Sequence, residues 1–142
     1  MSGPPAVSVV MTVRDGERYL AAAVDSVLAQ TLTNFELIVI DDGSTDSSPE
    51  ILAAYASRDG RILVHRQKNS GIAVSLNRAV SYARSPLIAR LDADDIARPR
   101  RLELQLGYLA QNTGVGVVGG AVAFIDEDAR QFAETRYPTT DA

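Results

Sequence analysis

Carboxylates gather in two short turns of this sequence. One turn is Asp41-Asp42-Gly43-Ser44-Thr45-Asp46, and the other is Asp92-Ala93-Asp94-Asp95. Three carboxylates within the four residues of the second turn repel one another unless a cation lies between them. Hard divalent ions take oxygen ligands and often use only one or two protein carboxylates, with phosphate oxygens supplying others. The second turn therefore predicts a site for Mn²⁺ or Mg²⁺; the alternative is an acidic cap on the next helix.

The two turns and one glycine-rich run each admit a further interpretation. Asp41 to Asp46 contains the residues that any strand-to-helix turn favours, although one of its carboxylates is also suited to accept hydrogen bonds from a base or a ribose. A calcium EF-hand at the second turn is excluded, because Ile96 and Ala97 stand where a ligand and a glycine are required. The run from Gly114 to Gly119 matches G-x-G-x-x-G, but it follows a predicted helix, so a dinucleotide fingerprint is rejected.

Composition excludes several classes of function. The 142 residues include no cysteine and one histidine, which argues against disulfides, zinc–thiolate sites and a Ser-His-Asp triad. The single histidine, His65, is interpreted as a strand residue without a catalytic role. The net charge of −4 and the lack of a basic stripe argue against nucleic acid as a partner. No apolar run reaches the roughly 18–20 residues of a membrane span, and the first five residues do not resemble a signal peptide.

Hydrophobic periodicity predicts five strands alternating with four helices. The strands are expected at 7–13, 35–40, 62–65, 87–91 and 115–124. The helices are expected to begin near Glu17, after an N-cap at Ser48, after Gly71, and at Pro99. Their predicted inner faces are Leu20, Val24, Val27 and Leu28; Ile51, Leu52 and Tyr55; Ala73, Leu76, Val80 and Ala83; and Leu102, Leu106 and Leu109. After Ile125 a turn at 126–128 is expected, and residues 136–138 predict no clear element.

This alternation predicts an α/β domain with a parallel sheet and right-handed crossovers. Ligands of open α/β sheets bind at the carboxyl ends of the strands. Polar residues follow each of the first four strands: Thr12, Arg14, Asp15 and Glu17; Asp41 and Asp42; Lys68, Asn69 and Gly71; and Asp92, Asp94 and Asp95. The sequence therefore predicts one convergent, carboxylate-rich site.

These segments resemble the family 2 glycosyltransferases of the GT-A fold. The likeness extends from about Val7 to Ile125, with the motifs in the family's order and at its spacing. It is carried by Ser26-Val27-Leu28-Ala29-Gln30-Thr31, by Phe35 to Asp46, by Asn69-Ser70-Gly71-Ile72-Ala73, by Leu76-Asn77-Arg78-Ala79 and by Ile88 to Ile96 followed by Pro99, Arg101-Leu102 and Gln105.

The resemblance implies a single GT-A donor-binding domain over residues 1–142, with a mostly parallel, Rossmann-like sheet flanked by helices. The implied activity is a metal-dependent, inverting hexosyl transfer from a nucleotide-diphosphate sugar, a UDP-sugar above all, to the hydroxyl of an unknown glycan or lipid-linked acceptor. The implied setting is polysaccharide biosynthesis for the cell surface, in the cytoplasm, with the full-length protein at the inner face of the membrane. Donor-binding residues implied are Thr12, Arg14, Asp15, Asp42, Asn69, Gly71, Asn77 and Asp92, and the metal ligands of the DXD motif are Asp92, Asp94 and Asp95.

Two features depart from a complete enzyme of this family. Many relatives carry an aromatic residue where Arg14 stands, and a guanidinium there is suited to stack or to bind phosphate. The general base of relatives lies later in the chain, so we expect it beyond Ala142, in the acceptor-binding half; a donor-binding fragment without catalysis is the alternative. A nucleotidyltransferase is disfavoured because no glycine-rich basic loop follows the first strand, and a receiver domain because no lysine follows the last.

Overall fold

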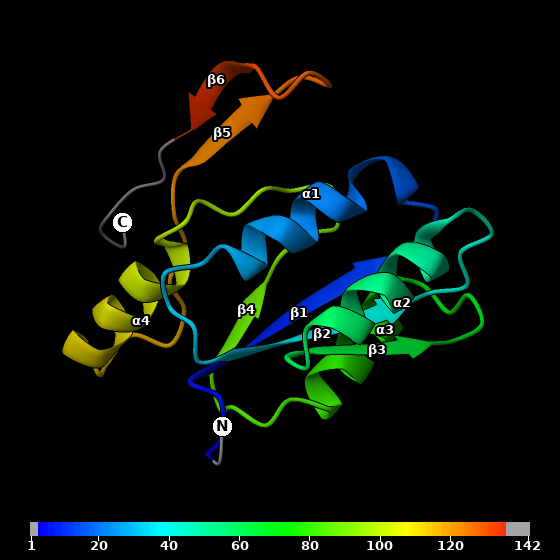
Figure 1. The fold of residues 1–142 in the computed structure, drawn as a ribbon. Coiled ribbons are helices and arrows are strands. Elements are labelled where there is room, and N and C mark those ends of the chain that lie inside the picture. Colours follow the sequence, from blue (N-terminus) through cyan, green and yellow to red (C-terminus); the bar gives the residue numbers. More distant parts are fainter. Residues whose placement is uncertain (1–2, 136–142) are drawn as a thin grey trace. The chain divides into compact units, whose positions relative to one another are not determined.

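The computed structural model describes residues 3–135, which form two compact units (Figure 1). The first unit runs to Glu103 and the second begins at Leu104. In chain order the elements are β1 (Val7–Val13), α1 (Glu17–Leu28), β2 (Phe35–Asp41), α2 (Ser48–Arg58), β3 (Ile62–Arg66), α3 (Ile72–Ser81), β4 (Ile88–Arg90), α4 (Arg101–Gln111), β5 (Val122–Ile125) and β6 (Gln131–Thr135).

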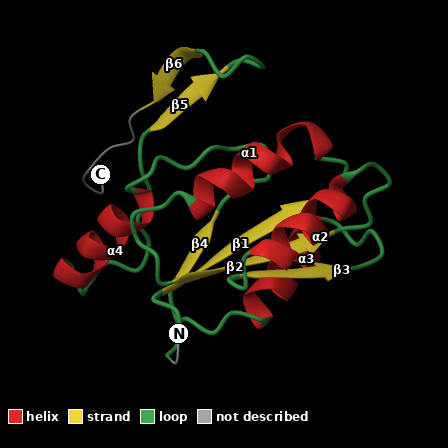
Figure 2. Ribbon diagram, viewed as in Figure 1, coloured by secondary structure: helices red, strands yellow, loops and turns green. Residues whose placement is uncertain are grey.

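A four-stranded parallel sheet in the order β3-β2-β1-β4 organises the first unit (Figure 2). The central strands β1 and β2 are almost wholly buried, which is expected of parallel strands covered on both faces and explains their near-continuous apolar sequences. The α/β class and the parallel sheet predicted from periodicity are confirmed.

Right-handed crossovers decide which helix covers which face. The chain steps from β1 to β2 and on to β3 in one direction, and then returns past β1 to β4. The handedness rule therefore puts α1 and α2 on one face and α3 on the other. On the α3 face, Ala79 packs against Val10, Ile38 and Ile40. The reversal of strand order beside β1 creates a topological switch point, where ligands of such sheets bind.

The starts of two helices differ from the prediction. Ser47, not Ser48, flanks the start of α2, and Ser48 lies inside the helix. Its buried hydroxyl accepts a hydrogen bond from the backbone N–H of Gly16 at 3.0 Å, so it links the loop after β1 to the first turn of α2 instead of capping its own helix. The last long helix, α4, begins at Arg101 and not at Pro99.

The inner face predicted for α3 is partly wrong. Ser75 and Ala79 are the buried residues of this helix, whereas Ala73 and Val80 are exposed. The hydroxyl of Ser75 bonds the carbonyl oxygen of Gly71 at 2.9 Å and also accepts a side-chain hydrogen bond from Gln67. A small polar residue can thus occupy an inward position when its hydroxyl is satisfied, a possibility that hydrophobic periodicity does not consider.

The fifth predicted strand, 115–124, is also wrong in extent and pairing. The strand is only β5, and it pairs antiparallel with β6 in a separate two-stranded sheet. Three glycines, at 116, 119 and 120, fall in the predicted span, and glycine disfavours strand structure. The turn at 126–128 is confirmed, whereas residues 136–138 lie outside the described part of the chain. Over residues 3–135, no helix has the length and apolarity that crossing a membrane requires.

Candidate functional site

A pocket of about 590 Å³ lies at the carboxyl ends of β1, β2 and β4. Its wall combines the loop after β1, the start of α3 and the acidic turn after β4. It is lined by Thr12, Val13, Arg14, Asp15, Gly16, Tyr19, Asp42, Asn69, Gly71, Ile72, Ser75, Asp92, Ala93 and Asp94. The convergence predicted from the ends of the strands is therefore present in the fold.

Asp15 joins the loop after β1 to the loop after β2 through hydrogen bonds. Its backbone N–H donates to the hydroxyl of Ser44 at 3.0 Å, and its carboxylate accepts the backbone N–H of Thr45 at 2.7 Å. These bonds hold Asp15 in the left-handed region, at φ 52°, which is uncommon for a residue with a side chain. Asp15 lines the pocket, but one carboxylate oxygen is already committed to Thr45.

The two aspartates after β2 have different environments. Asp41 is buried, accepts the backbone N–H of Ser44 at 2.9 Å, and forms an ion pair with Arg66 at 3.2 Å. Asp41 is not among the residues that line the pocket, whereas Asp42 is. Asp41 therefore shapes the turn, and Asp42 is the member of the pair that faces the site.

Asp42 organises the wall that precedes α3. Its Oδ1 accepts the side-chain amide of Gln67 at 2.7 Å and the backbone N–H of Ser70 at 2.8 Å, and its Oδ2 accepts the N–H of Gly71 at 2.9 Å. Burial opposes ionisation, but the hydrogen bonds from Gln67, Ser70 and Gly71 outweigh it and hold the pKa of Asp42 below its ordinary value. Asp42 is thus a fixed anion at the base of the pocket.

The acidic turn after β4 contributes two carboxylates to the pocket. Asp92 is held by Arg90 through two hydrogen bonds of 3.0 Å, whereas Asp94 makes no hydrogen bond or ion pair within residues 3–135. Asp95 is exposed and does not line the pocket; desolvation, followed by repulsion from Asp94 and Asp92, raises its pKa. Among the described residues, no three carboxylates or imidazoles come close enough to hold a metal by themselves.

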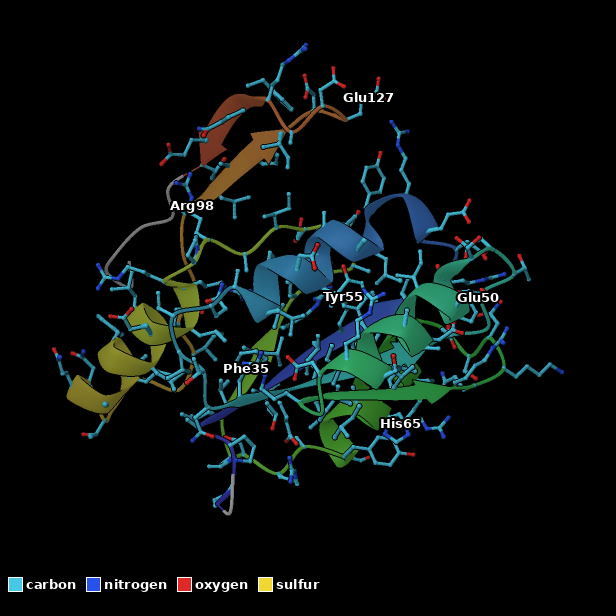
Figure 3. The ribbon with its side chains drawn as sticks, in the orientation of Figure 1. Phe35, Glu50, Tyr55, His65, Arg98 and Glu127 are labelled. Atoms are coloured by element: carbon cyan, nitrogen blue, oxygen red, sulfur yellow. The ribbon has the colours of Figure 1, made fainter. Side chains whose placement is uncertain are left out.

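Of the residues predicted for donor or metal binding, all line the pocket except Asn77 and Asp95. Asn77 is exposed on α3, and His65 lies on β3, where its ring stacks on Tyr82 at 3.9 Å (Figure 3). Sequence reasoning missed Tyr19, Ile72 and Ser75, which also line the pocket. Their position could have identified them, because each lies near the start of a helix that follows a polar loop.

The family model described as "Glycosyl transferase family 2" matches residues 8–140. This chain belongs to glycosyltransferase family 2. The family 2 chain is 39% identical to "Uncharacterized glycosyltransferase MJ1057" of Methanocaldococcus jannaschii, over 94% of its length and 48% of that protein. It is 34% identical to "O-antigen biosynthesis glycosyltransferase WbnJ" of Escherichia coli, over 93% of its length and 52% of that protein.

Solved structures confirm the fold of this family 2 domain. S. aureus TarS 1-349 in complex with UDP matches with a TM-score of 0.70 and 25% identity, covering 75% of this chain and 32% of that one. The structural neighbours are glycosyltransferases of GT-A type, so the GT-A fold predicted from the motifs is confirmed. The chain spans about half the length of the curated relatives that it matches.

Proposed function

We propose that this family 2 domain binds a nucleotide-diphosphate sugar, a UDP-sugar in particular, in the pocket at the carboxyl ends of β1, β2 and β4. The observation that carries the proposal is the meeting of Asp42, Asp92 and Asp94 in one pocket beside the reversal of strand order. TarS, which shares the fold at 25% identity, has been crystallised with UDP and with UDP-GlcNAc, and this supports the choice of ligand.

Asp92 and Asp94 are the residues that we propose for a divalent cation. Both line the pocket, and Asp94 has no competing partner among the described residues. Two carboxylates fit the donor set of Mn²⁺ or Mg²⁺ when diphosphate oxygens complete it, which agrees with the finding that no three described carboxylates are arranged to hold a metal together. When bound there, such an ion would neutralise charge on the diphosphate leaving group. Asp95 does not line the pocket and is a weaker candidate.

The other lining residues divide the remaining tasks. The guanidinium of Arg14 is exposed at the pocket, and the one ion pair that it forms within residues 3–135, with Asp15 at 3.8 Å, is long enough to be exchanged for a phosphate. The side chains of Thr12 and Asn69 offer neutral hydrogen bonds to the nucleoside or the sugar. The remaining acceptor position on Oδ2 of Asp42 is suited to accept from a base N–H. A role for Asn77 stays a prediction.

We propose that sugar transfer is an activity of the whole protein and inverts the anomeric carbon in a single displacement. That reaction needs a general base to take the proton of the acceptor hydroxyl, and we place this base in the acceptor-binding part of the protein. The name of WbnJ supports a role in building cell-surface polysaccharide. The second candidate, donor binding without transfer, applies to this domain when it is studied alone.

Calorimetric titration of UDP, GDP, CDP and ADP, each with and without Mn²⁺, tests the proposal. We expect UDP to bind, with an affinity that Mn²⁺ raises at least tenfold because the ion bridges two carboxylates and the diphosphate. The variant Asp94→Ala should lose this enhancement. The matched control Glu50→Ala removes a carboxylate from the exposed surface of α2 and should behave like the parent (Figure 3).

Each outcome separates the alternatives. Binding of UDP that is indifferent to Mn²⁺ and to Asp94→Ala would remove the metal assignment while keeping the donor pocket. The absence of binding by all four nucleotides would refute the donor pocket itself. Preference for another nucleotide would correct only the base. Transfer of sugar by this chain at an ordinary enzymatic rate would overturn the placement of the general base.

A further inference from the structure

We propose that Gln67 and Arg78 are positioning residues that hold the donor pocket's wall in its binding conformation, although neither lines the pocket. The inference rests on the proposed function for its consequence in nucleotide binding. Its structural part, that these two side chains keep Asp42 bonded to the wall, is independent of that function. The wall is defined here as residues 68–71, which lead into α3.

Gln67 joins the two lining residues that support the wall. Its side-chain nitrogen donates to the carboxylate of Asp42 at 2.7 Å and to the hydroxyl of Ser75 at 2.9 Å. The hydroxyl of Ser75, which is fully buried, donates a hydrogen bond to the carbonyl oxygen of Gly71 at 2.9 Å. One amide nitrogen therefore fixes both the anion at the base of the pocket and the first turn of α3.

Arg78 decides which way the amide of Gln67 points. Its guanidinium donates to Oε1 of Gln67 at 2.9 Å, and a guanidinium has no acceptor. The amide oxygen must therefore face Arg78, which leaves the nitrogen facing Asp42. Without this donor the amide oxygen loses its partner, and only Asp42 and Ser75 remain to hold the amide nitrogen in place.

Arg78 is itself held in place from its other side. Its Nε donates to the hydroxyl of Tyr82 at 3.3 Å, and its guanidinium lies 5.8 Å from the centre of that ring. The tyrosine ring also stacks on His65 of β3, at 3.9 Å between ring centres with an interplanar angle of 13°. A continuous series of contacts thus runs from β3 and the end of α3 to the base of the pocket.

The test combines amide exchange with nucleotide binding in the 142-residue chain. The backbone N–H groups of Ser70 and Gly71 report directly on their bonds to the pocket carboxylate. In Arg78→Met and Gln67→Met we expect both amides to exchange about tenfold faster by NMR and UDP with Mn²⁺ to bind about tenfold more weakly, because a charge-assisted bond is lost. Arg78→Lys, which keeps a donor, should restore much of both, and Arg58→Met should change neither.

Arg58 is a suitable control because it is also the basic residue in the last turn of its helix, and it is exposed. Unchanged exchange of Ser70 and Gly71 in both methionine variants would overturn the proposal. So would equal loss in Arg78→Lys and Arg78→Met, since simple loss of packing would then explain both. If the parent binds no nucleotide at all, the proposed function fails, while the exchange measurement still decides the positioning role.

Discussion

Replacing Glu36 by glutamine should destabilise the first unit at neutral pH and have little effect in acid. Glu36 lies on β2 with only 1% of its surface exposed. Its Oε1 accepts the hydroxyl of Ser8 at 2.6 Å and the backbone N–H of Arg84 at 2.8 Å, and its Oε2 accepts Nε of Arg84 at 2.6 Å. The carboxylate therefore ties β1 and the segment after α3 to the central strand.

The expected loss of stability depends on which hydrogen bonds of Glu36 a glutamine can keep. The carbonyl oxygen of the glutamine can take the place of Oε1 of Glu36. Its amide nitrogen then faces Nε of Arg84, and no hydrogen bond forms because both groups are donors. One charge-assisted bond is lost, which costs roughly 1.5–3 kcal/mol. Because the side chain of Arg84 is 64% exposed, water can solvate the released guanidinium, so the larger penalty for a stranded buried charge does not apply. We expect a loss of about 2 kcal/mol, or roughly 4–8 °C in Tm.

The pH dependence distinguishes this mechanism from general loss of packing. Burial raises the pKa of Glu36, but the bonds from Ser8 and Arg84 outweigh it and hold the pKa below the ordinary value of 4.5. A depressed folded-state pKa contributes stability that is present above the unfolded value and is lost as pH falls through the folded value. The difference between parent and variant should therefore be full above about pH 5 and shrink below 4.5.

Urea unfolding followed by circular dichroism, at pH values from 7 down to 3, measures this difference. The control Glu50→Gln makes the same chemical change on the exposed face of α2 and should alter stability by less than about 0.5 kcal/mol. A difference for Glu36→Gln that stays constant from pH 7 to 3 would refute the role of the ionised carboxylate. Equal stability of variant and parent at pH 7 would refute the whole argument.

Two other changes test separate parts of the first unit. Gly43→Ala should lower the unfolding free energy by about 2 kcal/mol and disturb the pocket wall, because Gly43 has φ +78° and a Cβ there would lie 2.9 Å from the backbone nitrogen of Asn69. The control Gly60→Ala has open space around it and should lower the unfolding free energy far less. Equal losses in the two variants would contradict the steric reasoning. In an alkaline titration followed by ultraviolet absorbance, one tyrosine should ionise near pH 12, since burial, and then the hydrogen bond to Asp25, raise the pKa of Tyr55 to about 12. Asp25→Asn should lower that pKa, and an unchanged transition would show that burial alone sets it.

Much of the site was predictable because parallel α/β sheets obey strong rules. Once strands were assigned before Thr12, Asp42 and Asp92, the rule on carboxyl ends brought these residues to one edge of the sheet. Hydrophobic alternation with helices also predicted the parallel pairing of β1, β2, β3 and β4. These inferences use only local periodicity and handedness, which the amino-acid order carries directly.

Other features depended on contacts between distant segments. Residue type and spacing did not distinguish Asp41 from Asp42, and only the family resemblance pointed to Asp42. Packing pairs Asp41 with Arg66 and presents Asp42 to the pocket. The inward position of Ser75 came from its bond to Gln67, which outweighed the apolar pattern of α3. The hairpin of β5 and β6 escaped prediction because strand pairing depends on partners that periodicity does not identify.

For this protein, the amino-acid sequence by itself determined the α/β class, the family and the edge of the sheet at which polar side chains meet. Only the tertiary structure decided the contacts within that edge: which aspartates line the pocket, which ones are already held by arginine, and that Gln67 bonds both Asp42 and Arg78. The physical reason is that periodicity and handedness act along the chain. Hydrogen bonds and ion pairs are instead settled between segments far apart in sequence, where direction and distance within a few tenths of an ångström determine the partner.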